Sequence, residues 1–299
     1  MSRVWKTALI LLLPNLALAH PGERLRPHDL LFAWEFDPAV VILLGVSAFF
    51  YVNGTFHQDS KSRLQSRAQR IYFWSGWIVL ALALISPLHR LGEALFSAHM
   101  VQHEALMLVA APLLVLSRPL VTFLWGMPFR WRCSIGAWSK SEYVRSVWNF
   151  LTDPFVAWST HAAAIWIWHA PLLFQLTLTS ELAHALQHLS FLLSALLFWW
   201  ALFYADGRKA YGAGVLYVFT TAVHTSILGA LLTFSPHVLY PGYAGTTQVW
   251  GLTPLEDQQI GGLVMWVPAG LIYLAVGLQL FARWIRESDV MLERTGSAK

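Results

Sequence analysis

The chain has 299 residues, of which 57% are hydrophobic and only 12% are charged, and its formal net charge is +4. This composition excludes an ordinary soluble domain and predicts an all-α integral membrane protein. No basic patch suggests nucleic-acid binding. The single cysteine, Cys133, excludes an internal disulfide or a CxxC metal site.

The first residues have the form of a secretory signal peptide. Two basic residues precede a short apolar run that ends in Ala-Leu-Ala at residues 17–19. We therefore expect residues 1–19 to be cleaved, so that residues 20–37 form an outer N-terminal segment beginning at His20. A terminal histidine can bind Cu(II) through its amine and its imidazole, which makes His20 a candidate ligand.

Seven apolar segments follow, each with the length and composition expected of a membrane-spanning helix. They cover residues 38–56, 70–88, 96–117, 154–174, 182–204, 213–234 and 260–282. We interpret residues 38–282 as one membrane domain, a seven-transmembrane-helix bundle, and residues 283–299 as a cytoplasmic tail.

Basic residues are concentrated in alternate connections between these segments. The stretches 57–70, 118–150, 205–212 and 283–299 carry 15 of the 20 Lys and Arg residues. Because cytoplasmic connections carry an excess of Lys and Arg, this asymmetry predicts an outer N-terminus and a cytoplasmic C-terminus. The expected location is the bacterial plasma (inner) membrane, where lipid surrounds the bundle.

With this orientation, histidines from different segments lie near the outer face. His99 and His103 form one i, i+4 pair, His184 and His188 form a second, and His169 reaches the same level. Residues at i and i+4 share a helix face, so each pair is arranged to bind one ion. Such a cluster suits copper or zinc, and haem is a further candidate cofactor.

Two acidic residues accompany the histidines. Glu104 directly follows the first pair, and Asp257 lies at the head of the last segment. Because a ligating imidazole commonly donates its other N–H to a carboxylate, each is a candidate extra ligand or orienting group. A single histidine such as His89 is more simply interpreted as a packing residue, whereas the two pairs together favour a metal.

Four stretches carry a resemblance to a known family. They read HMVQHEALMLVAAPLLVLSRP, WIWHAPLLFQLTL, LAHALQHLSFLLSALLFWW and EDQQIGGLVMWVP, in this order within residues 40–282. The chain resembles the CtaG-type family of membrane cytochrome c oxidase assembly factors, first associated with caa-type oxidases. The positions that match its motifs are His99, His103, His169, His184, His188, Asp257 and Gln258.

The resemblance implies a non-enzymatic protein that is needed to produce active haem–copper oxidase and has a proposed role in copper supply. Its implied partners are oxidase subunits and a periplasmic copper chaperone. Together with the histidine pattern, it predicts an assembly factor that binds copper in an outer-facing cluster and assists metal insertion or maturation of the oxidase.

Other functions are also compatible with the histidines. One alternative is a b-type cytochrome with bis-His haem, although pairs on one helical turn suit a compact ion better. Another is a copper permease, in which His161 and His224 continue a path inward; otherwise these two are intramembrane hydrogen-bonding residues. A diiron hydroxylase is disfavoured, because the chain has no HxxHH motif and its clustered histidines are predicted to face outward.

Overall fold

The structure is a computed structural model that describes residues 25–57, 67–204 and 209–296. Every regular element in these ranges is a helix. In chain order they are η1 (Leu30–Phe32), α2 (Pro38–His57), α3 (Arg67–Ile85), α4 (Pro87–Ala94), α5 (Phe96–Glu104), η3 (Ala105–Ala110), α6 (Ala111–Ser117), α7 (Pro119–Gly126), α8 (Phe129–Trp138), α9 (Glu142–Leu151), α10 (Pro154–His169), α11 (Pro171–Thr177), α12 (Glu181–Tyr204), α13 (Lys209–Thr233), η4 (Pro241–Gly245), η5 (Thr247–Trp250) and α14 (Pro254–Gly296). The all-α class is confirmed, while the predicted signal peptide lies outside the described residues.

Six helical stretches of the described chain are long and apolar enough to cross a membrane. They are α2, α3, the continuous run α5–η3–α6, α12, α13 and most of α14. The predicted segment 154–174 is divided instead, because α10 ends at His169 and Pro171 begins α11. A proline cannot continue the hydrogen-bond ladder of the helix before it, so this segment consists of two shorter helices.

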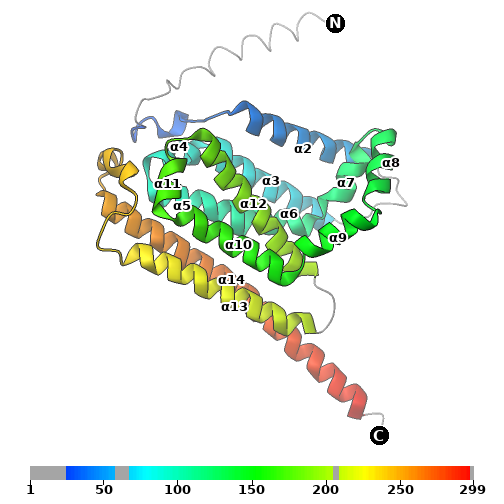
Figure 1. Ribbon diagram of the computed structural model, residues 1–299. Coiled ribbons are helices and arrows are strands. Elements are labelled where there is room, and N and C mark those ends of the chain that lie inside the picture. The colour runs from blue at the N-terminus through cyan, green and yellow to red at the C-terminus, as the bar shows by residue number, and fades with distance from the viewer. Residues whose placement is uncertain (1–24, 58–66, 205–208, 297–299) are drawn as a thin grey trace, which may run out of the picture.

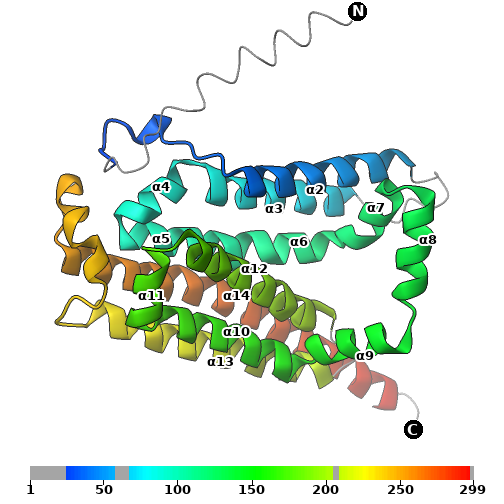
Figure 2. The same ribbon diagram turned by 45° about the horizontal axis from the view of Figure 1, so that its top comes forward.

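The long helices run side by side and short helices close the two ends of the bundle (Figures 1 and 2). α13 packs along α14, α2 packs against α7, and α10 packs against α12. The short helices α4 and α11 lie at one end, called the α4 end below, while α8 and α9 lie at the other (Figure 2). α14 continues past the predicted boundary at residue 282 to Gly296.

Proline and a capping side chain define where the shorter helices begin. Ser86 precedes Pro87 and its hydroxyl accepts a hydrogen bond from the Leu88 N–H at 3.2 Å. Asp153 caps α10 in the same way, ahead of Pro154. Proline suits the first helical position, because its missing N–H would have no partner there and its φ is already helical.

A π-helix, η3, interrupts the helical run between the first histidine pair and α6. Its wider turn was not predicted from the sequence. Trp199 of α12 donates a hydrogen bond from Nε1 to the Met107 carbonyl within this turn, at 2.8 Å. π-turns are rare, and many of them occur at functional sites. This one directly follows Glu104 and the first histidine pair, so it marks that region as a candidate site.

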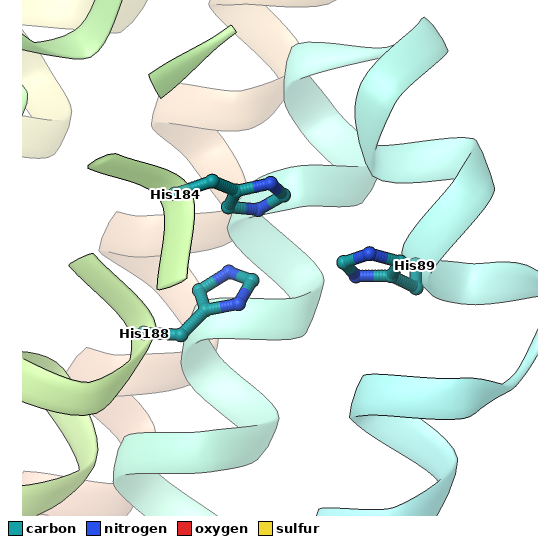
Figure 3. Close-up of side chains that lie close together, drawn as sticks. All are labelled: His89, His184 and His188. Carbon is teal, nitrogen blue, oxygen red and sulfur yellow. The ribbon is translucent and has the colours of Figure 1, made fainter. Parts of the chain in front are cut away.

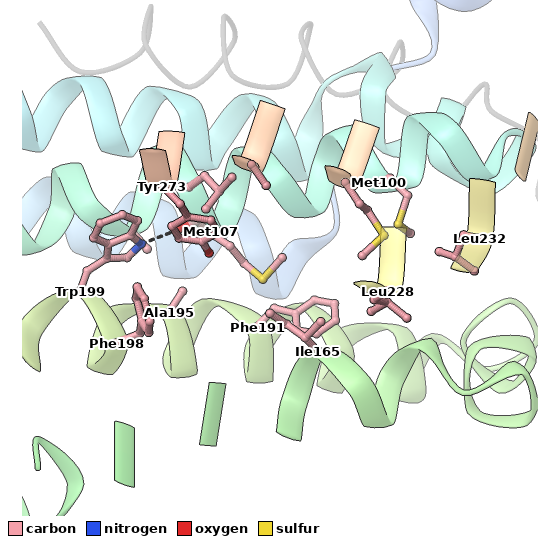
Figure 4. Close-up of a cluster of buried hydrophobic side chains, with 14 of the residues drawn as sticks. Met100, Met107, Ile165, Phe191, Ala195, Phe198, Trp199, Leu228, Leu232 and Tyr273 are labelled. Carbon is pink, nitrogen blue, oxygen red and sulfur yellow. Dashed lines mark hydrogen bonds between the residues drawn. The ribbon is translucent and has the colours of Figure 1, made fainter. Parts of the chain in front are cut away.

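The core is formed where η3, α12, α13 and α14 meet (Figure 4). Phe191, Phe198 and Trp199 are at most 1% exposed, and Met107 and Tyr273 pack with them. The outward faces are also apolar, and side chains such as Leu43, Leu216 and Leu271 are more than half exposed. A soluble monomer rarely exposes apolar patches of this extent, so the surface is that of a membrane protein.

Candidate metal centre

The histidines of the α4 end come together from three helices. α5 supplies His99 and His103, α12 supplies His184 and His188, and α4 supplies His89. Within each pair the two rings lie close, with centroids 4.3 Å apart on α5 and 4.4 Å apart on α12. Both predicted i, i+4 pairs therefore share a helix face, as their spacing requires.

Three of these residues form an inner group: His99, His103 and His188. One nitrogen of each lies within 4.8 Å of a nitrogen of the other two. The His188 ring centroid is 5.6 Å from that of His99 and 5.3 Å from that of His103. The three side chains are between 0% and 8% exposed, so this group is enclosed by protein.

A second set, called the middle group, consists of His89, His184 and His188, whose rings point toward one common region (Figure 3). The His89 ring stacks on that of His184 with centroids 5.3 Å apart, and its centroid is 6.1 Å from that of His188. His184 also stacks on His99 at 5.2 Å. His188 therefore belongs to both the inner and the middle group.

Many ring nitrogens in these groups have no hydrogen-bond partner within the described part of the chain. They are Nδ1 of His99, both nitrogens of His103, and Nε2 of His184 and of His188. A buried polar atom without a partner costs about 1–3 kcal/mol, and folded proteins retain few of them. The residues that carry them form the inner and middle groups, which fits a bound cation, because a cation would accept several nitrogen lone pairs at once.

Gln187 determines which nitrogen of His99 is free. His99 Nε2 donates a hydrogen bond to Gln187 Oε1 at 3.2 Å. An amide oxygen can only accept, so the proton of neutral His99 lies on Nε2 and Nδ1 keeps its lone pair. This is how an outer residue commonly orients a metal-binding imidazole. Gln187 lies between His184 and His188 in the sequence, but sequence analysis did not identify it as a functional residue.

His89 is held differently, by Gln102. The Gln102 amide nitrogen donates to the Ala83 carbonyl at 2.7 Å and to His89 Nδ1 at 2.9 Å. Pro87, four residues after Ala83, has no N–H to offer that carbonyl, so Gln102 replaces the missing helical donor. The proton of neutral His89 then lies on Nε2. Burial lowers the pKa of His89 below 6.5, although Glu35 opposes this shift.

A third set of candidate ligands, called the mouth group, adds two carboxylates to His89. Glu35, His89 and Glu93 each have a ligand atom within 4.8 Å of the other two. Arg90 lies among them, with NH1 2.7 Å from Glu93 Oε2 and 3.7 Å from Glu35 Oε2. Burial raises the pKa of Glu93, while Arg90 acts in the opposite direction. Sequence analysis missed both carboxylates. Glu93 follows His89 at the i, i+4 spacing, which could have indicated it, whereas Glu35 is distant from His89 in the sequence.

His169 lies beside the inner group but its nitrogens are engaged elsewhere. Nδ1 donates to the Ile165 carbonyl at 2.7 Å, and Nε2 lies 3.4 Å from Met100 Sδ. The ring centroid is 6.2 Å from that of His103. His169 therefore belongs to none of the three groups found in the described ranges.

Asp257 anchors α5 instead of joining the histidines. Its carboxylate accepts hydrogen bonds from the Phe96 N–H at 2.6 Å, the Ser97 N–H at 3.1 Å and the Ser97 hydroxyl at 2.5 Å. It thus satisfies free N–H groups at the start of α5 and ties that helix to α14. Neighbouring Gln258 accepts from the Leu239 N–H at 2.6 Å and so holds the loop before α14.

The two remaining predicted ligands are not brought into the cluster. Glu104 Oε2 is buried and has no hydrogen-bond partner among the described residues, but it joins none of the ligand groups found there. His20 lies outside the described residues. The predicted set thus divides into the two pairs, which converge, and the other residues, which have different surroundings.

Comparison with known proteins gives one family and distant relatives. Residues 49–287 match the family described as cytochrome c oxidase caa3 assembly factor (Caa3_CtaG). The chain is 25% identical over 271 residues to an uncharacterized protein of Mycobacterium leprae, covering 85% of this chain and 40% of that protein. An uncharacterized protein of Mycobacterium bovis is also 25% identical, with 88% and 41% covered. The chain therefore spans about two fifths of these relatives, and no solved structure matches it significantly.

Proposed function

Because the chain belongs to the family of cytochrome c oxidase caa3 assembly factors, we propose that it binds copper at the inner group and assists metal insertion into, or maturation of, the oxidase. In this proposal the chain acts without catalysing a reaction. Its partners are the oxidase subunits that receive the ion and a periplasmic copper chaperone that supplies it. Copper is thus the cargo of the protein.

The observation that carries this proposal is the set of unpartnered imidazole nitrogens. His99, His103 and His188 each bring one ring nitrogen to within 4.8 Å of the others in a buried place, and each of these residues has an unpartnered ring nitrogen. Imidazole suits Zn and Cu among other transition metals, and a given site generally binds Cu(II) more tightly than Zn(II). The membership of an oxidase assembly family supports the choice of copper.

We place the α4 end toward the outer face of the plasma membrane. The support is the distribution of basic residues, since the connections at the opposite end carry most of the Lys and Arg of the chain. With this orientation, copper enters from the periplasmic side and need not cross the bilayer.

The two alternative functions find less support in the geometry. A bis-His haem lies between its two axial rings, but the His99 and His103 rings approach to 4.3 Å between centroids, which leaves no room for a macrocycle between these two. A permease would need a polar path beyond the inner group. His161 lies deeper in the bundle, but its Nδ1 already contacts Ser194 Oγ at 3.0 Å.

The test combines oxidase assembly with copper analysis. A strain lacking this protein is complemented with the wild type, with His188→Ala, or with the matched control His161→Ala. We expect the wild type and the control to restore active oxidase with its copper, and His188→Ala to fail at comparable protein levels. Purified wild type should retain copper in a stoichiometric amount.

Three results would contradict the proposal. They are wild-type protein without stoichiometric copper after loading, full complementation by His188→Ala, and a Soret band in the purified protein, which would favour the cytochrome. Copper uptake into vesicles that contain only this protein would instead favour the permease.

A further inference from the structure

The three candidate ligand groups at the α4 end are linked by shared members. The order from surface to interior is the mouth group (Glu35, His89, Glu93), the middle group (His89, His184, His188) and the inner group (His99, His103, His188). His89 belongs to the first two groups and His188 to the last two. Solvent exposure decreases in the same order. The Glu93 side chain of the mouth group is 42% exposed, whereas His99 of the inner group is 0% exposed.

The mouth group has the charge and the ligands to attract a cation. Two carboxylates surround one guanidinium, so the three charged side chains sum to a net negative charge. Glu35 Oε2 is shielded from solvent and has no hydrogen bond with the described residues, and it lies 3.9 Å from His89 Nε2. Arg90 contacts both carboxylates, so it competes with an arriving cation and keeps binding at the mouth weak.

The hydrogen bonds of His89 make the two outer groups weaker than the inner one. Because Gln102 donates to His89 Nδ1, the proton of neutral His89 lies on Nε2, the nitrogen that faces Glu35. A cation that binds there must displace this proton into solvent. By contrast, His99 Nδ1 already has a free lone pair, as the contact with Gln187 requires. Affinity therefore rises toward the interior.

We propose that the mouth group captures the copper ion and that ligand exchange passes it through the middle group to the inner group. This inference rests on the proposed function, because it assigns the route by which that site is filled. His89 stays bound during the first transfer and His188 during the second, so the ion always keeps a protein ligand. The carboxylates govern how quickly the site fills, and the buried histidines govern how tightly copper is held.

The experiment separates the rate of loading from the amount of copper bound. Purified full-length protein is mixed with Cu(II), quenching of tryptophan fluorescence gives the rate, and copper retained after desalting gives the amount. The test variant is Glu35→Gln/Glu93→Gln. The control is Asp29→Asn, which removes a carboxylate at the same end but outside the ligand groups in the described ranges.

We expect the test variant to load about tenfold more slowly than the control, because a charged mouth raises the association rate of a cation by 10-fold or more. The copper retained at equilibrium should be unchanged in both variants. Arg90→Gln removes the competing guanidinium and should therefore increase the rate of copper loading. This opposite shift also argues against misfolding as the cause.

The outcomes distinguish the proposed path of copper, which begins at the mouth group, from the binding of copper at the inner group. Wild type that retains no copper would overturn both the proposed function and this inference. Wild type that retains copper, together with a test variant that loads at the control rate, would overturn the route alone. A test variant that loses copper at equilibrium would also overturn it, since the carboxylates would then belong to the final site.

Discussion

Two sets of histidines lie in this bundle, and they differ in what their ring nitrogens contact. His103 of the inner group is 1% exposed and has no hydrogen-bond partner on either nitrogen within the described ranges. His161 is also 1% exposed, but its Nδ1 contacts Ser194 Oγ. His224 accepts a hydrogen bond from Trp166 Nε1 at 3.3 Å. His103 and His161 are thus equally buried, while His224 is only partly buried, so burial does not by itself indicate a ligand.

The two sets differ in whether unpartnered ring nitrogens occur on several neighbouring histidines. His224 also has one unpartnered nitrogen, but it belongs to no group of ligand atoms among the described residues. In the inner group, several such nitrogens face one another, and each costs free energy of folding when it is left without a partner. This concentration of unpartnered nitrogens in the inner group is the feature that supports the proposed copper site.

Removing the proposed ligands should produce the largest difference in copper affinity between the two sets of histidines. We expect His103→Ala/His188→Ala to lower copper affinity by more than about 100-fold, because even the loss of outer residues that orient ligands costs 10–100-fold. His161→Ala, equally buried, should retain wild-type affinity. Competition with a copper chelator measures the affinity, and melting temperatures with and without copper check the fold. Equal losses in the two variants would show that both sets act through packing.

Removing the residue that orients His99 should have the next largest effect. Gln187→Leu keeps the volume of the side chain but deletes the acceptor for His99 Nε2. The ring can then take either tautomer or rotate, so copper affinity should fall by about 10-fold. The same chelator competition detects this change. Unchanged affinity in a folded variant would mean that His99 Nδ1 is not a ligand atom.

The sequence predicted the histidine pairs well because helix periodicity is local. The spacing from His99 to His103, and from His184 to His188, determines that each pair shares a face, whatever surrounds it. Hydropathy and charge then placed both pairs at the same end of the bundle. Only the packing of the α5–η3–α6 run against α12 was needed to bring them together, and it left His169 beside the cluster with its own partners.

The acidic residues could not be assigned in this way, because their roles depend on contacts between distant parts of the chain. Asp257 contacts Phe96 and Ser97 across more than 150 residues, as part of a helix cap. Glu35 reaches His89 only through the fold. The division of segment 154–174 was more accessible, since Pro171 within an apolar run indicates a helix boundary.

Weakening the anchor of α5 should affect stability more than copper binding. Asp257→Asn retains one acceptor but loses the charge that strengthens three hydrogen bonds to Phe96 and Ser97. We expect the free energy of unfolding to fall by about 2 kcal/mol. Thermal unfolding in detergent measures the loss, and chelator competition below the transition should give affinity within about twofold of wild type. A loss of copper as large as that of the ligand variant would show that Asp257 acts at the metal.

The smallest effect is expected at the partnered histidine. Ser194 donates from Oγ to the Phe191 carbonyl at 3.2 Å, so the same oxygen accepts from His161 Nδ1. Ser194→Ala leaves this N–H without its acceptor, which should lower the free energy of unfolding by about 1 kcal/mol. Copper affinity and oxidase assembly should be unchanged, because His161 lies outside the proposed copper site. If Ser194→Ala instead weakened copper binding while the fold was retained, the two sets of histidines would be coupled, and a path for copper toward the interior would gain support.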